Sequence, residues 1–394
     1  MSDPGRKAIR VLYVFLAASV FGTCLPAEDN SSGKREETYF TFTKTGSLIS
    51  RPPEMRKPGP YYTCLVDMKG VKQFPFRYAL LFSTDHGNRG GIWMYVCNGV
   101  PTVADNWKSY TKAVADGDFN YLKKKPEANP IFIDNTQGKQ TETPYANVID
   151  GKVYMTYHNC GAGHSQSTLL AVSEDGVNFT RVNGKKDSVI IDYDPRKWPG
   201  NGHTGYFRWG PNPFSGVRYR YVGYSLHGGG GRSHSAMWGS DDIITWDKIE
   251  VMDHIEGHAI ENGKFIKWLE IDPKSITSCG NGEYVAICVG GTRSSGNRPR
   301  INELFEIFLA SDGRTLTRKG RKILKKGNPG TDDEEEVSQP TTIIIKDTWH
   351  LIYVGTAQKA RRNTVMGAVG KLNRKAGPSV PLKKADRTRH FLRK

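Results

Sequence analysis

Short apolar segments led by an aromatic residue recur along the chain, at intervals of about 70 residues. Each is five to seven residues long and mixes apolar, aromatic and small polar residues, which is typical of strands and not of amphipathic helices. Five segments share this pattern: Tyr78–Ser83, Tyr154–His158, Tyr219–Ser225, Tyr284–Cys288 and Trp349–Val354. The body of the chain therefore predicts five similar units built from β-strands.

A second pattern follows the first: an apolar strand ends in a turn of Ser, Asp and Gly, and then an aromatic residue or Thr. Clear copies are Leu169–Thr180, Ala236–Trp246 and Phe308–Thr317, and a looser copy runs from Trp93–Cys97 to Asn106–Trp107. Units of three or four strands that cannot bury both faces alone stack radially in a propeller. A parallel β-helix needs shorter repeats, and a two-sheet sandwich does not explain five units.

The predicted fold is therefore all-β, a five-bladed β-propeller over residues 28–370. The alternating stretch Tyr39–Thr43 is expected to supply the strand that closes the ring. Residues 1–27 are expected to be a secretory signal, because Arg6, Lys7 and Arg10 precede an apolar run that ends near Ala27. Export to the periplasm or the medium follows from this prediction, with lipid anchoring at Cys24 as the alternative. After signal removal, no integral membrane segment is expected.

The net charge of +16 first suggests an anionic partner, but much of this charge lies at the ends of the chain. Residues 371–394 carry nine Lys and Arg residues against one Asp. Such a basic tail is typical of a disordered, solvated terminus, and it does not by itself predict nucleic-acid binding. No nucleic-acid partner is expected, and contact of the tail with an anionic polymer stays an alternative.

No organic cofactor is expected, because no nucleotide, flavin or haem motif occurs in the sequence. The five cysteines beyond the signal follow no metal-binding spacing, so we expect buried thiols, with one disulfide as the alternative. The acidic run Asp332–Glu336 lacks the alternating ligand spacing of a calcium loop. A solvated turn is the preferred interpretation of this run, and a calcium site is the alternative.

Candidate functional residues come first from the strands expected to line the propeller axis. Three such segments precede aromatic-led strands in the sequence, and they begin at Glu142, His203 and Glu336. Glu142, His203 and either Glu336 or Gln339 should therefore occupy comparable positions that face a shared centre.

Polar, glycine-rich loops follow four of the aromatic-led strands, and glycine allows a ligand to approach the backbone closely. They carry Asp85 and the candidate sugar-binding residues His86, Arg89, His164, His227, Arg232 and Arg293. His158 and Gln339 complete the polar set, and Trp209 is a candidate for stacking on a sugar, as are Trp93 and Trp238. The mixture favours a carbohydrate, and because arginine suits bidentate recognition of carboxylate or sulfate, an anionic sugar is one candidate substrate.

The pattern over residues 142–157, followed by the turn at 173–180, resembles the blade signature of five-bladed propeller glycosidases. That superfamily includes arabinanases, β-xylosidases, invertases, levansucrases and neoagarooligosaccharide hydrolases. The resemblance implies a glycoside hydrolase with a carboxylate from the first blade as base or nucleophile and an acid from a later blade. On this chain it implies Asp85 for the first role and Glu142 as acid or acid modulator. His203 stands where many members carry Glu, and Glu303 and Glu306 are reserves.

Each of these assignments has a purely structural alternative. Asp85 could form a turn, Glu142 could cap a loop, and His203 could be a structural imidazole. Two other classes of protein also stay open. One is a glycan-binding propeller without catalysis, and the other is a lyase or sialidase-like enzyme built on His, Arg and a tyrosine such as Tyr145, Tyr157 or Tyr206.

Overall fold

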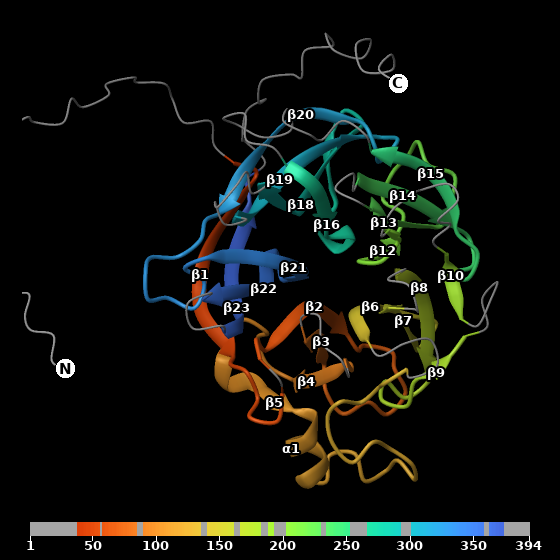
Figure 1. Cartoon of the computed structure of the whole chain (residues 1–394), viewed down its shortest axis with the longest axis vertical. Coiled ribbons are helices and arrows are strands. Elements are labelled where there is room, and N and C mark those ends of the chain that lie inside the picture. Colours follow the sequence, from red (N-terminus) through yellow and green to blue (C-terminus); the bar gives the residue numbers. More distant parts are fainter. Residues whose placement is uncertain are drawn as a thin grey trace, which may run out of the picture. The chain divides into compact units, whose positions relative to one another are not determined.

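The computed structural model describes residues 38–55, 57–84, 90–134, 140–160, 166–182, 188–192, 202–229, 234–252, 266–292, 301–357 and 362–373. Strands dominate these residues, and they form five blades around a common axis, so the predicted five-bladed β-propeller is confirmed. Figure 1 shows the blades in chain order around the centre. The expected signal and the basic tail from residue 374 onward lie outside the described residues.

The first three blades follow one plan, in which each strand pairs antiparallel with the next and the innermost strand comes first. Blade I contains β2 (Pro60–Asp67), β3 (Tyr78–Thr84), β4 (Trp93–Cys97) and β5 (Trp107–Ser109), followed by helix α1 (Tyr110–Ala115). Blade II contains β6 (Thr141–Ile149), β7 (Lys152–Cys160) and β8 (Gln166–Ser173), with β9 (Thr180–Arg181) and β10 (Val189–Ile191) both on β8. Blade III contains β12 (Arg208–Pro211), β13 (Tyr221–Gly229), β14 (His234–Ser240) and β15 (Asp247–Met252).

Blade IV contains β16 (Ile266–Ile271), β17 (Thr277–Gly280), β18 (Glu283–Thr292), β19 (Ile301–Ala310) and β20 (Leu316–Leu324). Blade V contains β21 (Glu336–Ile345), β22 (Thr348–Ala357) and β23 (Arg362–Leu372). Its outermost strand is β1 (Phe40–Ile49), which pairs antiparallel with β23. The expected closure of the ring by the Tyr39–Thr43 stretch is thus confirmed, and the two ends of the propeller are joined within one sheet.

The recurring Ser-Asp-Gly turns join the third strand of a blade to its outer strand, and an aspartate holds each one together. The Asp175 carboxylate accepts hydrogen bonds from the backbone N–H groups of Val177 and Asn178, both at 2.8 Å. Asp242 and Asp312 accept the corresponding pairs of backbone N–H groups in blades III and IV. Aspartate suits this position because its short side chain reaches the backbone two and three residues further on.

Apolar side chains fill the spaces between the blades. One large cluster joins blades I, II and III, and smaller clusters lie between the remaining neighbours. Cys64, Cys97 and Cys288 are buried free thiols within this packing, as expected for most of the cysteines. Within the described ranges, no helix is both long and apolar enough to cross a membrane.

Candidate functional site

The strands that precede the polar loops all end at a single face of the propeller. In each blade the second strand runs antiparallel to the innermost strand, so it ends where the innermost strand begins. We call this end of the propeller the loop face. Asp85, His86, Arg89, His164, Arg232 and Arg293 lie outside the described residues.

Three innermost strands, and the segment that leads into β12, carry the same backbone irregularity near the loop face. Tyr62, Thr143, Tyr206 and Gln339 have positive φ angles of 54°, 53°, 55° and 54°. In β2, β6 and β21 these residues sit at a shift in the pairing register, which marks a β-bulge. Bulges re-aim side chains and are common beside active sites, and a left-handed conformation is costly for residues other than glycine. Four blades therefore hold equivalent strained residues at the same level of the axis.

These four residues surround a small cavity at the axis, with a volume of about 10 Å³. That is about the room that one water molecule needs. Its other lining residues are Thr63, Pro144, Tyr145, Phe207 and Arg208. The axis is therefore nearly filled at this depth, and a ligand larger than water would have to lie nearer the loop face.

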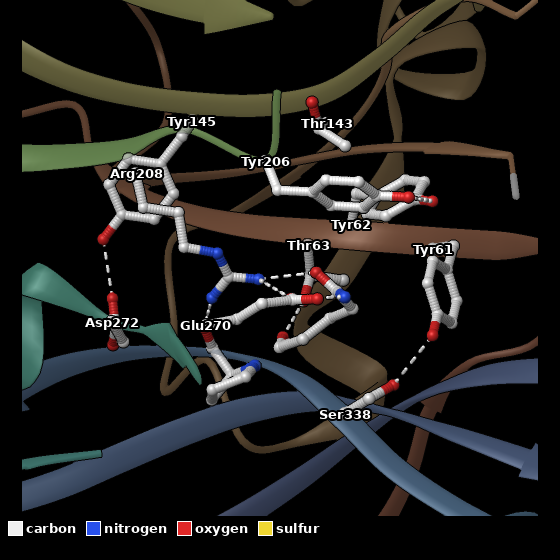
Figure 2. A network of polar contacts seen from close by, with 12 residues as sticks. Tyr61, Tyr62, Thr63, Thr143, Tyr145, Tyr206, Arg208, Glu270, Asp272 and Ser338 are labelled. Carbon is white, nitrogen blue, oxygen red and sulfur yellow. Dashed lines mark hydrogen bonds and ion pairs between the residues drawn. The ribbon is translucent and has the colours of Figure 1, made fainter. Parts of the chain in front are cut away.

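Arg208 closes the axis beneath the cavity by joining three blades. From β12 its guanidinium donates to the Pro340 carbonyl at 2.7 Å and to the Gln339 amide oxygen at 2.5 Å, both in blade V. It also lies 3.5 Å from the Glu270 carboxylate of blade IV, which accepts a 2.7 Å hydrogen bond from Gln339. Because buried charges must be paired, Arg208, Glu270 and Gln339 depend on one another (Figure 2).

A second polar layer lies close to the Arg208 group. The Tyr145 hydroxyl donates to the Asp272 carboxylate at 2.6 Å, and Thr342 donates to the other oxygen at 2.8 Å. Burial raises the pKa of Asp272, although these donors and the nearby Arg208 oppose the shift. Lys274 binds the carbonyls of Leu65 and Ala146, at 2.5 and 2.9 Å. These contacts tie blades I, II, IV and V together at the axis.

Three tyrosines form a wall at the loop-face end of the cavity, and we call Tyr61, Tyr62 and Tyr206 the tyrosine wall. The Tyr62 and Tyr206 hydroxyls lie 3.0 Å apart, and the rings of Tyr61 and Tyr62 pack edge to face. Tyr61 donates a 2.7 Å hydrogen bond to Glu336, which also accepts one from Asn302. Tyr61, Tyr206 and Glu336 are partly exposed.

Glu142 lies at the other end of the tyrosine wall, beside His158. The two side chains are fully buried, with 3.5 Å between Glu142 Oε2 and His158 Nε2. His158 Nδ1 lies 2.6 Å from the Thr143 hydroxyl, and its ring packs against Tyr62 and Tyr206. A buried Glu–His pair can hold one proton between two fixed atoms. The structure thus brings Glu142 and His158 together, and it places Gln339 at the axis.

The expected equivalence of Glu142 and His203 needs correction by two residues. The matching positive φ angles align Tyr206 with Thr143, so Gly205 and not His203 corresponds to Glu142. His203 lies in the short strand β11 (Gly202–His203), which pairs with β13 and β8. By the same alignment His203 corresponds to Glu336, three residues before Gln339. The offset arises because Tyr206 lies between the separate strands β11 and β12, whereas Thr143 lies inside the continuous strand β6, and the sequence pattern does not reveal this break.

The tryptophans proposed for sugar stacking lie in the core instead. Trp209 is fully buried, and its ring contacts Tyr221 and Trp246. Trp93 and Trp238 are also buried, and the Trp238 indole N–H donates to Ser225. His227 is buried near the Trp238 ring, with 6.3 Å between the ring centroids. A ring enclosed by neighbouring side chains has no free face for a sugar, so these residues serve packing between the strands.

The two reserve glutamates also have structural partners. Glu306 is buried and accepts the backbone N–H groups of Tyr39 and Phe40. Glu303 pairs with Lys322 at the outside of blade IV. The acidic run is engaged as well: Asp332 pairs with Arg362 and Asp333 with Lys44. Among the residues with described side chains, no cluster of three or more His, Cys, Asp or Glu could hold a metal ion.

Tyr61, Tyr62, Arg208 and Glu270 were not singled out by the sequence patterns. Tyr61 and Tyr62 could have been found by extending the alignment of innermost strands to blade I, where Pro60–Asp67 precedes the aromatic-led strand. Arg208 offered a different signal, because a charged residue between Phe207 and Trp209 in a strand must either face water or find a buried partner.

No protein-family model matches the chain, and no curated protein matches its sequence. Solved structures do resemble its fold. A glycosyl hydrolase from Bacteroides ovatus has a TM-score of 0.54 at 12% identity, and the match covers 87% of this chain and 96% of that one. An N-acetylgalactosamine deacetylase from F. plautii, solved with blood group B trisaccharide, has a TM-score of 0.56 at 13% identity, covering 87% and 100% of the two chains.

A third similar structure comes from the GH130 family of mannoside phosphorylases, which contains glycoside hydrolases that target β-1,2 mannosidic linkages in Candida mannan. Its TM-score is 0.55 at 13% identity, and the match covers 88% of this chain and 97% of that one. At such identities the likeness establishes the fold alone. The predicted resemblance to five-bladed propeller glycosidases is therefore confirmed at the level of the fold. Because a deacetylase shares this fold, the reaction has to be argued from the site.

Proposed function

We propose that this protein is an exported glycoside hydrolase that cleaves an oligosaccharide or polysaccharide at the loop face of its propeller. The fold supports this proposal, because solved glycoside hydrolases share it. The observation that carries it is the line of contacts from Glu336 through the tyrosine wall to His158 and Glu142. Two glutamates from blades V and II thereby flank one aromatic surface at the mouth of the axis.

In the proposed mechanism, carboxyl groups divide the work of a glycosidase. One must protonate the leaving oxygen while another activates water or attacks the sugar from the opposite face. Glu336 is the partly exposed carboxylate, and Asp85 is proposed as its counterpart from the first blade. Glu142, with 0% exposure, is proposed as an acid modulator that acts through His158, since a fully buried carboxyl does not touch substrate. His203 is proposed either as a substituted acid or as a substrate ligand.

The test is release of sugar by the purified chain, residues 28–394, from a panel of neutral, sulfated and uronate-containing oligosaccharides. Glu336→Gln and Asp85→Asn are expected to lower kcat at least 100-fold, because general acid–base catalysis contributes about 10²–10⁴. Glu142→Gln is expected to shift the pH profile of kcat and to lower its maximum less. Glu174→Gln is the matched control, since among the described residues this exposed glutamate pairs with Lys152 of blade II.

Full activity in a folded Glu336→Gln variant would refute the assignment of Glu336. If the wild type binds a glycan without cleaving it, the proposal of a hydrolase gives way to that of a glycan-binding propeller. Export is tested separately, by locating the protein in cell fractions and sequencing its mature N-terminus. A mature chain that begins near Glu28 is expected, and a lipid-modified Cys24 would instead establish the anchored alternative.

A second candidate function rests on the hydrogen bond between Tyr61 and Glu336. A tyrosine within 2.7 Å of a carboxylate is placed as a nucleophile with its base, the arrangement that sialidases use in place of two carboxylates. In that case Tyr61→Phe should abolish turnover, and a mechanism-based inhibitor should label Tyr61. The two-carboxylate hydrolase instead predicts that Tyr61→Phe keeps measurable activity, because the hydroxyl then only orients Glu336.

A further inference from the structure

A groove on the outer rim of the propeller lies where the edges of blades IV and V meet. It is lined by Phe42 and Lys44 of β1, by Lys322–Asn328 at the end of β20, and by Thr331 and Asp333. Figure 1 shows the segment between β20 and β21 passing along the outer side of β1, far from the centre of the ring. All of these residues are described, and none of them belongs to the axial site.

The segment between β20 and β21 is held against β1 by polar contacts. Lys44 forms an ion pair with Asp333 at 2.6 Å, and Ser47 donates a 2.6 Å hydrogen bond to Asp332. Within the segment, the Gly327 N–H bonds the Asp333 carbonyl at 2.9 Å. The groove is therefore part of the folded scaffold and is present before any ligand arrives.

The charge that the groove presents to solvent is positive. Asp333 and Glu303 neutralise Lys44 and Lys322, but these carboxylates are covered, with exposed fractions of 3% and 12%. The ammonium groups lie above them, with Lys44 30% and Lys322 36% exposed. Lys325 and Lys326 are exposed, and no ion pair is recorded for either among the described residues.

The size and the floor of the groove match a chain of sugar rings. Its volume is about 560 Å³, within the range of about 300–1,000 Å³ typical of small-ligand sites. Phe42 and Ile323 supply a partly buried apolar floor, while Asn328 and Thr331 offer hydrogen-bonding groups at the side. Among the described lining residues Phe42 is the one aromatic ring, whereas single-stranded nucleic acids are usually held on several aromatic platforms.

We infer that this rim groove is a second glycan-binding site, which holds a sulfated or carboxylated polysaccharide chain on the outside of the propeller. Lys325 and Lys326 bind the anionic groups, and the floor around Phe42 contacts the sugar rings. The inference is independent of catalysis at the axis, because it concerns binding at another surface. A long substrate held on the rim would also raise its local concentration at the loop face.

The test is binding of a heparin oligosaccharide to the chain of residues 28–394, with its desulfated counterpart as the neutral probe. Lys325→Ser combined with Lys326→Ser should weaken binding about five- to tenfold, the effect of losing two exposed charge contacts. Lys69→Ser combined with Lys72→Ser removes two exposed lysines from blade I and should leave affinity unchanged. Raising the salt concentration should weaken wild-type binding and narrow the gap between wild type and the rim variant.

Because the tail of residues 374–394 is also basic, the site of binding must be located directly. Acetylation of lysines, mapped by mass spectrometry with and without the oligosaccharide, should show protection at Lys322, Lys325 and Lys326 but not at Lys69. Protection confined to the tail, or equal affinity for the desulfated probe, would overturn the inference. A DNA oligonucleotide that binds the groove more tightly than the glycan does would overturn it in favour of a nucleic-acid site.

Discussion

Gly205 sets how closely blade III can approach His158 of blade II. A Cβ atom at this glycine would lie 3.0 Å from His158 Nδ1 and 3.2 Å from Cγ, closer than ordinary van der Waals contact. His158 cannot retreat freely, because it is fully buried between Glu142, Thr143 and the tyrosine wall. The glycine is therefore required by packing against the histidine and not by its own backbone angles.

Gly205→Ala is expected to lower the free energy of unfolding by about 1–2 kcal/mol, the usual cost of overpacking a buried site. Because the added methyl group must push His158 away from Thr143 or Glu142, any activity at the loop face should fall with it. Urea unfolding and the turnover assay measure the two effects. Gly210→Ala in β12 is the control, where the nearest atom to the new Cβ is 3.7 Å away. Equal stability of the two variants would contradict this account.

At the scale of single residues, the sequence predicted types of residue better than their positions. Glu142 lies near the axis, as predicted. It could be predicted because it stands at the start of a strand whose repeat is clear in the sequence. His203 was placed at the wrong level because the chain breaks between β11 and β12, and this break leaves no mark in the pattern of apolar residues. The assignment of Trp209 to sugar stacking was wrong. Whether an aromatic ring is exposed depends on contacts with other strands, which the sequence does not show.

At the scale of elements, the aspartate turns explain why the blade repeat could be recognised. The turn of blade IV depends on Asp312, which accepts hydrogen bonds from the backbone of Arg314 and Thr315 and from the Thr315 hydroxyl. The turn needs an aspartate at a fixed distance from the residues whose backbone it binds. This spacing can be recognised in the sequence even where the neighbouring strands vary. The number and type of the blades were predictable for this physical reason.

Asp312→Ala is expected to lower the free energy of unfolding by about 1–3 kcal/mol, because the backbone N–H groups of the turn lose a charged acceptor. Asp312→Asn should cost less, since the amide oxygen can accept the same two backbone hydrogen bonds. Thermal or urea unfolding of both variants at neutral pH checks the order. An equal loss for the two variants would show that the charge and not hydrogen-bond geometry maintains the turn.

The same turn predicts a pH dependence of stability. Burial acts to raise the pKa of Asp312, but the donors from Thr315 and Arg314 outweigh it and lower the pKa below its ordinary value of 3.8. A lowered pKa in the folded state stabilises the fold above pH 3.8 and loses this contribution as pH falls through the folded value. The stability gap between wild type and Asp312→Ala should therefore be constant above about pH 5 and shrink below pH 3.8. A gap that widens in acid would refute the assignment.

At the scale of the whole molecule, closure of the ring depends on how β1 is held. Besides its pairing with β23, the start of the strand is bound by Glu306 of blade IV, which accepts the N–H groups of Tyr39 at 3.2 Å and Phe40 at 2.9 Å. Arg321 binds the same carboxylate at 2.7 Å, and both charged side chains are buried. The alternation of apolar and polar residues predicted a closing strand. It could not predict the hydrogen bonds to Glu306, which we call the Glu306 clasp, because the partners lie more than 260 residues apart.

Glu306→Gln is expected to lower the free energy of unfolding by about 3–5 kcal/mol, because it leaves the Arg321 charge buried without its carboxylate. Combining it with Arg321→Met should recover part of this loss, since the double variant no longer buries the guanidinium group. The control is Glu283→Gln, which breaks the more exposed pair with Arg318 on the same blade and should cost about 1 kcal/mol or less.

Hydrogen exchange then shows where the damage lies. If Glu306 fastens the ring, the amides of Phe40–Ile49 should exchange faster in Glu306→Gln at denaturant concentrations where blades I to III remain protected. Uniform acceleration throughout the propeller would mean that β1 opens only with global unfolding. In that case the β1–β23 pairing, and not the Glu306 clasp, would be what keeps the ring closed.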